Sequence, residues 1–170
     1  MSLFPLICVR CIVALEQEPD PEAAAAVHFE LRLGCPPNHE PDRDFLSRLR
    51  QEKGGVLTHD AIAAVTDADV VYTDTWTSMG QEGEAAKRRR EFKDYQVNRA
   101  LMKHAKPDAV VMHCLPAHRG EEITDELLDG AQSVVLEQAE NRLHAQKAVM
   151  VWLLRPEILT HQGMPASPRI

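Results

Sequence analysis

Ala109-Val110-Val111-Met112, followed directly by His113-Cys114-Leu115-Pro116, is the stretch that decides the fold. A short apolar run of this kind is typical of a strand buried in a parallel sheet. Open α/β sheets bind their ligands at the carboxyl ends of the strands, so the thiol of Cys114 is placed for chemistry as well as for packing. The cysteine after this strand is therefore a candidate site residue.

Two further clusters of polar residues follow apolar runs in the same way. The run 69–73 leads into Asp74-Thr75-Trp76-Thr77-Ser78-Met79-Gly80, and the run 133–136 is followed by Glu140-Asn141-Arg142. One polar residue after a strand is common and is often only a turn or a helix cap. Three such clusters in this order indicate a site.

The apolar runs alternate with helical patterns, which is typical of βαβ units. We expect a single-domain α/β fold with a doubly wound, mostly parallel, Rossmann-like sheet and helices on both faces. The expected strands lie near residues 6–14, 27–33, 55–58, 69–73, 109–113 and 133–136.

Helices are expected between these strands, each with a recognisable start. Pro41-Asp42 begins one that ends before Gly54, and Asp60 caps the next, with Ile62 and Val65 facing inward. A long charged helix is expected over 82–104, interrupted near 94–95, and its basic run 87–90 is interpreted as a solvated face. A short helix capped at Thr124 precedes a last one over 140–154, whose apolar residues on all sides predict burial on more than one side.

Length and composition favour one ordered domain. The 170 residues are 44% hydrophobic and 26% charged, and a chain of this size buries roughly 70% of its unfolded surface. We expect the domain to span residues 1–155, with 1–26 outside the family pattern described below, and residues 156–170 to form a loose proline-containing tail.

The net charge and the cysteine content limit which partners and which cellular compartment are expected. A formal net charge of −7 argues against nucleic acid and anionic membranes, both of which select basic surfaces. The longest apolar stretches fall short of the roughly 20 residues that span a bilayer. The apolar start lacks a basic export signal and the four cysteines do not suggest a disulfide framework, so a cytoplasmic location is expected.

The three clusters together resemble the carboxyl-terminal half of ornithine carbamoyltransferases, which carry Asp-x-x-x-Ser-Met-Gly-Gln, His-Cys-Leu-Pro and Glu-Asn-Arg in this order. The resemblance runs from about His28 to Leu154. Related aspartate enzymes usually carry His-Pro-Leu-Pro, so Cys114 favours the ornithine branch. The carbamoyl-phosphate-binding half, with Ser-x-Arg-Thr-Arg and His-Pro-x-Gln, is absent, and Leu15 to Asp20 stands where the family has an asparagine-containing turn.

The resemblance implies a role for each candidate residue. Asp74 would accept from the ornithine ammonium, while Ser78 and the amide of Met79 would bind the carboxylate. Cys114, which with Arg142 is a candidate catalytic residue, would line the pocket and help to orient or deprotonate the amine, and the carbonyl of Leu115 would take a carbamoyl nitrogen. The remaining two are His113, which either contacts the donor carbonyl or simply ends the strand, and Arg142, which would open the last helix and bind the donor.

The resemblance also implies the reaction and its partners. Carbamoyl phosphate and L-ornithine would give citrulline and phosphate by direct attack of the amine, with no metal and no organic cofactor. Family members are homotrimers, so a homo-oligomer is expected here. Because the donor half is missing, the last helix would lose its usual cover, and we expect self-association or poor solubility.

Simpler interpretations of single residues stay open beside this one. An unpaired cysteine such as Cys114 is more often inert core than reactive. Arg142 could form a structural salt bridge to Glu137 or Glu140, and Trp76 is better explained by packing than by recognition.

Three other functions compete with catalysis. Cys8-x-x-Cys11 and Cys35-x-x-x-His39 superficially resemble zinc spacing, but residues three apart in a strand point to opposite faces. The chain could be a non-catalytic remnant that binds an amino acid or a full-length relative. It could also be a related transferase that acts on another amine, such as putrescine.

Overall fold

The computed structural model describes residues 6–10, 30–51, 55–77 and 82–154. The chain forms two compact units, residues 1–135 and 136–170. The sequence placed the end of the first domain at residue 155, and that boundary stays a prediction.

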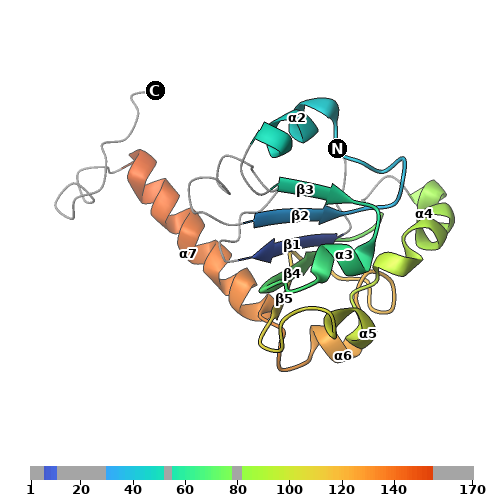
Figure 1. Ribbon diagram of the computed structural model, residues 1–170. Coiled ribbons are helices and arrows are strands. Elements are labelled where there is room, and N and C mark those ends of the chain that lie inside the picture. Colours follow the sequence, from blue (N-terminus) through green and yellow to red (C-terminus); the bar gives the residue numbers. More distant parts are fainter. Residues whose placement is uncertain (1–5, 11–29, 52–54, 78–81, 155–170) are drawn as a thin grey trace. The chain divides into compact units, whose positions relative to one another are not determined.

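The first unit contains a five-stranded sheet in the order β3-β2-β1-β4-β5 (Figure 1). The strands are β1 Leu6–Arg10, β2 Glu30–Gly34, β3 Gly55–Thr58, β4 Val70–Thr73 and β5 Val110–His113. The expected α/β class is confirmed. The expected strand 133–136 is wrong, because Ser133 forms only an isolated bridge to Val111 and a helix begins at Val135.

Helical crossovers join the two parallel strand pairs. β2 and β3 are connected through α2 Arg43–Gln51, and β4 and β5 through α4 Ala85–Glu91 and α5 Arg99–Met102. Parallel neighbours need such crossovers, since a tight hairpin cannot join them. β1 is different, because it runs antiparallel to both β2 and β4. Alternation of apolar residues predicts a strand but not its direction.

The expected helix starts are largely confirmed. Asp42 Oδ1 accepts from the amide of Phe45 at the start of α2, and Asp60 Oδ1 accepts from the amides of Ile62 and Ala63 at the start of α3 Ala61–Val65. Ile62, which was expected to face inward, is exposed, whereas Val65 is fully buried.

The charged region 82–104 breaks where the sequence predicted. α4 ends at Glu91, a short 3-10 helix covers Lys93–Tyr95, and Asn98 caps α5. The basic run makes ion pairs along and beside its helix: Lys87 with Glu91, Arg88 with Glu84, and Arg89 with Glu121.

The two remaining helices are α6 Asp125–Leu128 and α7 Val135–Leu154. Thr124 stands at the start of α6, but its hydroxyl makes no capping hydrogen bond, so the expected cap is wrong. In α7, which belongs to the second unit, Leu143, Met150 and Leu154 are exposed, contrary to the expected burial. No helix in the described part of the chain is both long and apolar enough to cross a bilayer.

The core of the first unit holds β4 and β5 in place. Val71 and Val111, on these neighbouring strands, are fully buried and belong to one cluster with Val97 and Ile123 from the loops that follow. Such close packing fixes the strand ends to well-defined positions.

We expect the change of Asp60 to alanine to lower the free energy of unfolding by about 1 kcal/mol, because two amides of α3 lose their acceptor. Urea denaturation measures the difference, with the exposed Asp108→Ala as the control. Equal stability of the two variants would show that this cap contributes nothing.

Candidate functional site

Asp74 and Cys114 lie side by side at the carboxyl edge of the sheet. Thr73 of β4 stands opposite His113 of β5 in the parallel register, so the next residue of each strand is brought to the same place. The Cys114 thiol donates to Asp74 Oδ1 at 2.9 Å, and the same oxygen accepts from the amide of Thr75 at 2.6 Å. The sequence predicted this convergence from the two strand ends.

The Cys114 thiol is protonated near neutral pH. Burial and the hydrogen bond and charge of Asp74 raise its pKa to about 12. A thiol with such a pKa is a hydrogen-bond donor and a poor nucleophile, since the thiolate is the reactive form. The site is therefore suited to holding an amine beside a carboxylate, without covalent chemistry at sulfur.

His113 is buried and is held from two directions. Its Nδ1 accepts from the amide of Leu115 at 2.8 Å, and because Nδ1 is an acceptor, the ring proton lies on Nε2. Nε2 lies 3.2 Å from Glu122 Oε1 and donates to it. Cys114 lies between His113 and Leu115 in the chain, so the hydrogen bond that joins these two residues closes a small loop that includes the backbone of Cys114.

His113 and Leu115 differ in exposure: His113 is buried and Leu115 is exposed. With both ring nitrogens engaged at a side chain that is 1% exposed, the geometry favours a positioning role for His113. Leu115 is exposed and has φ 57°, an uncommon conformation for a residue with a side chain.

Glu122 is the residue that sequence reasoning missed. Its carboxylate is fully buried and also accepts from the amide of His118 at 2.5 Å. Glu121, its neighbour in the chain, is partly exposed and forms an ion pair with Arg89 instead. Two adjacent glutamates carry the same signal in the sequence, so no pattern marks the buried one.

The other candidates do not belong to the described residues of the first unit. Ser78 and Met79 lie outside the described residues. Arg142 is exposed in α7 and belongs to the second unit. The expectation that it opens the helix is wrong, because α7 begins at Val135 and the field of the free amides is confined to the first turn.

Among the described residues, neither Cys35 nor His39 belongs to a cluster of three metal-ligating side chains. Cys35 is buried, and its burial raises the pKa of its thiol to about 12. His39 pairs with Glu91 and lies edge-on against Phe92. The Cys8 side chain and Cys11 are outside the described residues.

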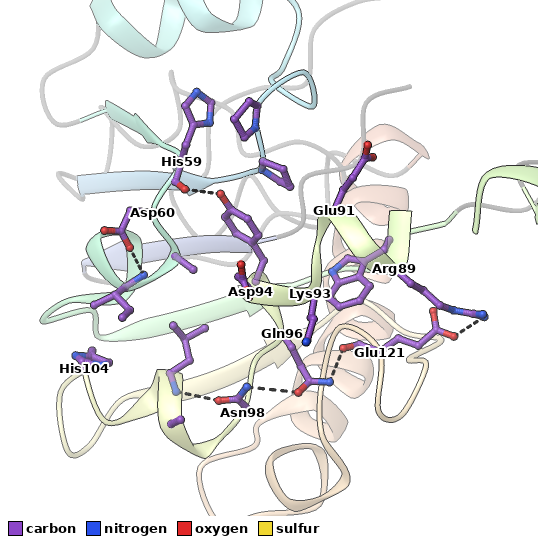
Figure 2. A pocket seen from close by; sticks show the side chains of 18 of the residues that line it. His59, Asp60, Arg89, Glu91, Lys93, Asp94, Gln96, Asn98, His104 and Glu121 are labelled. Carbon is purple, nitrogen blue, oxygen red and sulfur yellow. Dashed lines mark hydrogen bonds and ion pairs between the residues drawn. The ribbon is translucent and has the colours of Figure 1, made fainter. Parts of the chain in front are cut away.

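A separate open groove, drawn in Figure 2, has a volume of about 1140 Å³. It is lined by His59, Trp76, Arg89, Lys93, Tyr95 and Glu121 among others, and neither Asp74 nor Cys114 contributes. Trp76 is buried and stacks on Phe92, with ring centroids 6.0 Å apart. Its packing is as expected from the sequence.

Comparison with known proteins identifies the family to which the chain is similar. Residues 20–153 match the family described as "Aspartate/ornithine carbamoyltransferase, Asp/Orn binding domain". The ornithine carbamoyltransferase of Syntrophus aciditrophicus is 56% identical over 134 residues, covering 78% of this chain and 44% of the relative. That of Thermococcus kodakarensis is 57% identical over 127 residues, covering 72% of this chain and 40% of the relative.

Two solved structures to which the chain is similar are also ornithine carbamoyltransferases. The ornithine carbamoyltransferase from Pyrococcus furiosus is 54% identical with a TM-score of 0.64, over 71% of this chain and 40% of that one. The anabolic enzyme from Campylobacter jejuni is 34% identical with a TM-score of 0.70, over 78% of this chain and 46% of that one. The chain thus spans less than half the length of these relatives.

Proposed function

The chain belongs to the aspartate/ornithine carbamoyltransferase family, and from this we propose that it is an ornithine-binding half of a carbamoyltransferase. The observation that carries the proposal is the hydrogen bond between Cys114 and Asp74 at the carboxyl edge of the sheet. A carboxylate beside a neutral thiol offers an acceptor for an ammonium group and a second polar atom that can orient it.

The parent reaction would use these two side chains on the acceptor side. The δ-ammonium of ornithine gives one proton to solvent, and the neutral amine attacks the carbonyl carbon of carbamoyl phosphate, passing its second proton to the departing phosphate. The new N–C bond forms as the C–O bond to phosphate breaks, giving citrulline and phosphate. Asp74 is the group that holds the ammonium before the proton leaves, while Cys114, with its pKa raised to about 12, stays protonated and orients the nitrogen.

The remaining family positions complete the proposed site. Ser78 and the amide of Met79 would bind the amino-acid carboxylate, because Gly80 permits a turn that directs successive donors at one anion. The carbonyl of Leu115 and the guanidinium of Arg142 would face the carbamoyl group. We further propose a homo-oligomer in the cytoplasm, a compartment in keeping with the free thiols of Cys35 and Cys114.

L-Ornithine, titrated into the full chain by calorimetry, tests the proposal directly. Norvaline, which lacks the side-chain amine, and putrescine, which lacks the carboxylate, are the matched controls. We expect binding of ornithine and neither control. Binding of putrescine alone would support the other amine-directed transferase, and no binding of ornithine would contradict the proposal.

A second candidate function, amino-acid binding without turnover, is favoured by one observation. The contact that carries the proposal, between Cys114 and Asp74, concerns the acceptor amine and does not involve the carbamoyl donor. If ornithine binds but no citrulline forms from added carbamoyl phosphate, the chain is a binding module. If citrulline forms, it is a catalyst.

The hydrogen bonds of His113 predict opposite behaviour of two similar variants. Asparagine can place an oxygen near the Nδ1 position and still accept from Leu115, whereas glutamine can reach Glu122 but leaves the amide of Leu115 without an acceptor. We expect His113→Gln to weaken ornithine binding roughly 10-fold, and His113→Asn to weaken it much less.

Calorimetry measures the binding of both variants, and thermal unfolding monitors their fold. Both substitutions remove a buried ring, so both should lower stability. If the two variants lose ornithine affinity equally, His113 acts only through stability and its positioning role is contradicted.

A further inference from the structure

The loop between β5 and α6 brings together three metal-ligating side chains, those of His118, Glu121 and Glu122. One ligand atom from each lies within 4.8 Å of the others. The loop is fixed by its backbone, because Gln96 Nε2 donates to the carbonyl of Glu121 at 2.8 Å, as Figure 2 shows, and the Val97 amide donates to that of Glu122 at 2.8 Å. The cluster is therefore held in place by neighbouring backbone.

One oxygen in this cluster lacks a donor. Glu122 is 0% exposed, and its Oε1 accepts from the amide of His118 and from His113. Its Oε2 is buried without a hydrogen-bond partner anywhere in the described part of the chain and lies 3.8 Å from His118 Nδ1. A buried carboxylate oxygen without a donor is costly and calls for a cation or a water.

The charges around the cluster favour a cation. Two carboxylates face one imidazole, and Arg89 pairs with Oε1 of Glu121 at 2.7 Å (Figure 2). The nearby Arg119 is directed to Asp125 and Asp129. His118 is half exposed, so an ion can reach the cluster from solvent.

We propose that His118, Glu121 and Glu122 form a binding site for a divalent transition-metal ion. An imidazole with two carboxylates suits Zn²⁺ or a similar ion better than Mg²⁺ or Ca²⁺, which prefer ligand sets made only of oxygen. The ion takes Oε2 of Glu122, a carboxylate oxygen of Glu121 and an imidazole nitrogen of His118, and water fills the rest of its coordination. The site is distinct from Asp74 and Cys114 and does not depend on carbamoyl transfer.

Zn²⁺, titrated into the full chain by calorimetry, tests this site. We expect His118→Ala to lose one equivalent of bound Zn²⁺, and Glu121→Gln to bind that equivalent roughly 10-fold more weakly. Glu126→Gln, which changes an exposed carboxylate outside the cluster, should bind as the wild type does. Circular dichroism verifies that each variant keeps its fold.

Co²⁺ absorption identifies the ligands of the same site. We expect a spectrum without a sulfur-to-cobalt charge-transfer band for the equivalent that His118→Ala removes. A sulfur band that disappears in Cys114→Ser, with binding unchanged in His118→Ala, would place the ion on Asp74, His113 and Cys114 and overturn the proposal. Failure to bind Zn²⁺ at about 100 μM would overturn it as well.

Discussion

Replacing Asp74 by asparagine is expected to weaken ornithine binding by roughly 10- to 150-fold. A charge-assisted hydrogen bond contributes about 1.5–3 kcal/mol, and asparagine keeps the shape of the side chain while it removes the charge. Asp74 Oδ1 already accepts from the thiol of Cys114 and the amide of Thr75, so its position is fixed before the ligand arrives. Calorimetry with L-ornithine measures the effect.

The matched control is Asp69→Asn, which removes a carboxylate just before the same strand, at the opposite edge of the sheet, where Asp69 pairs with Lys106. This variant should bind ornithine like the wild type. If the wild type and Asp74→Asn bind ornithine with equal affinity, the Asp74 carboxylate does not bind the ammonium group.

The second large effect concerns the reactivity of Cys114 toward iodoacetamide. Because its pKa is raised to about 12, the thiolate fraction at pH 8 is about 10⁻⁴, and the alkylation rate should rise about tenfold for each pH unit up to about pH 11. An ordinary cysteine would level off near pH 9 to 10. Mass spectrometry of the Cys114 peptide follows the rate.

Asp74→Asn should speed this alkylation by about 10-fold or more at pH 8. Removing a like charge that lies within hydrogen-bond distance typically lowers the pKa by 1–3 units, although the contribution of burial remains. Cys35 provides the internal reference, because its pKa is also about 12 but is raised mainly by burial. Parallel acceleration at both cysteines would indicate general loosening of the fold and contradict the assigned contact.

The parts of the fold that follow from local pattern could be predicted. The apolar runs at β4 and β5 and the carboxylates that cap α2 and α3 carry their signal within a few residues. The direction of β1 could not be predicted, because it depends on pairing with distant strands. The strand expected at 133–136 failed because a short apolar run fits the first turn of a helix equally well.

Some site residues could likewise be predicted from local pattern, whereas others depend on contacts between distant parts of the chain. Parallel register alone brings Asp74 to Cys114, and both could be named from the strands that precede them. Glu122 could not, since its burial arises from the return of the loop onto His113. Arg142 was assigned to a helix start because the run 133–136 was interpreted as a strand, whereas α7 already begins at Val135.

The central claim is that the amine of ornithine lies between Asp74 and Cys114. Protection of Cys114 from alkylation tests it most directly, with the rate measured at pH 9 against increasing L-ornithine and with norvaline as the control. We predict saturable slowing by ornithine, none by norvaline, and no change at Cys35. An alkylation rate of Cys114 that is unchanged at ornithine concentrations that saturate calorimetric binding would place the ligand elsewhere.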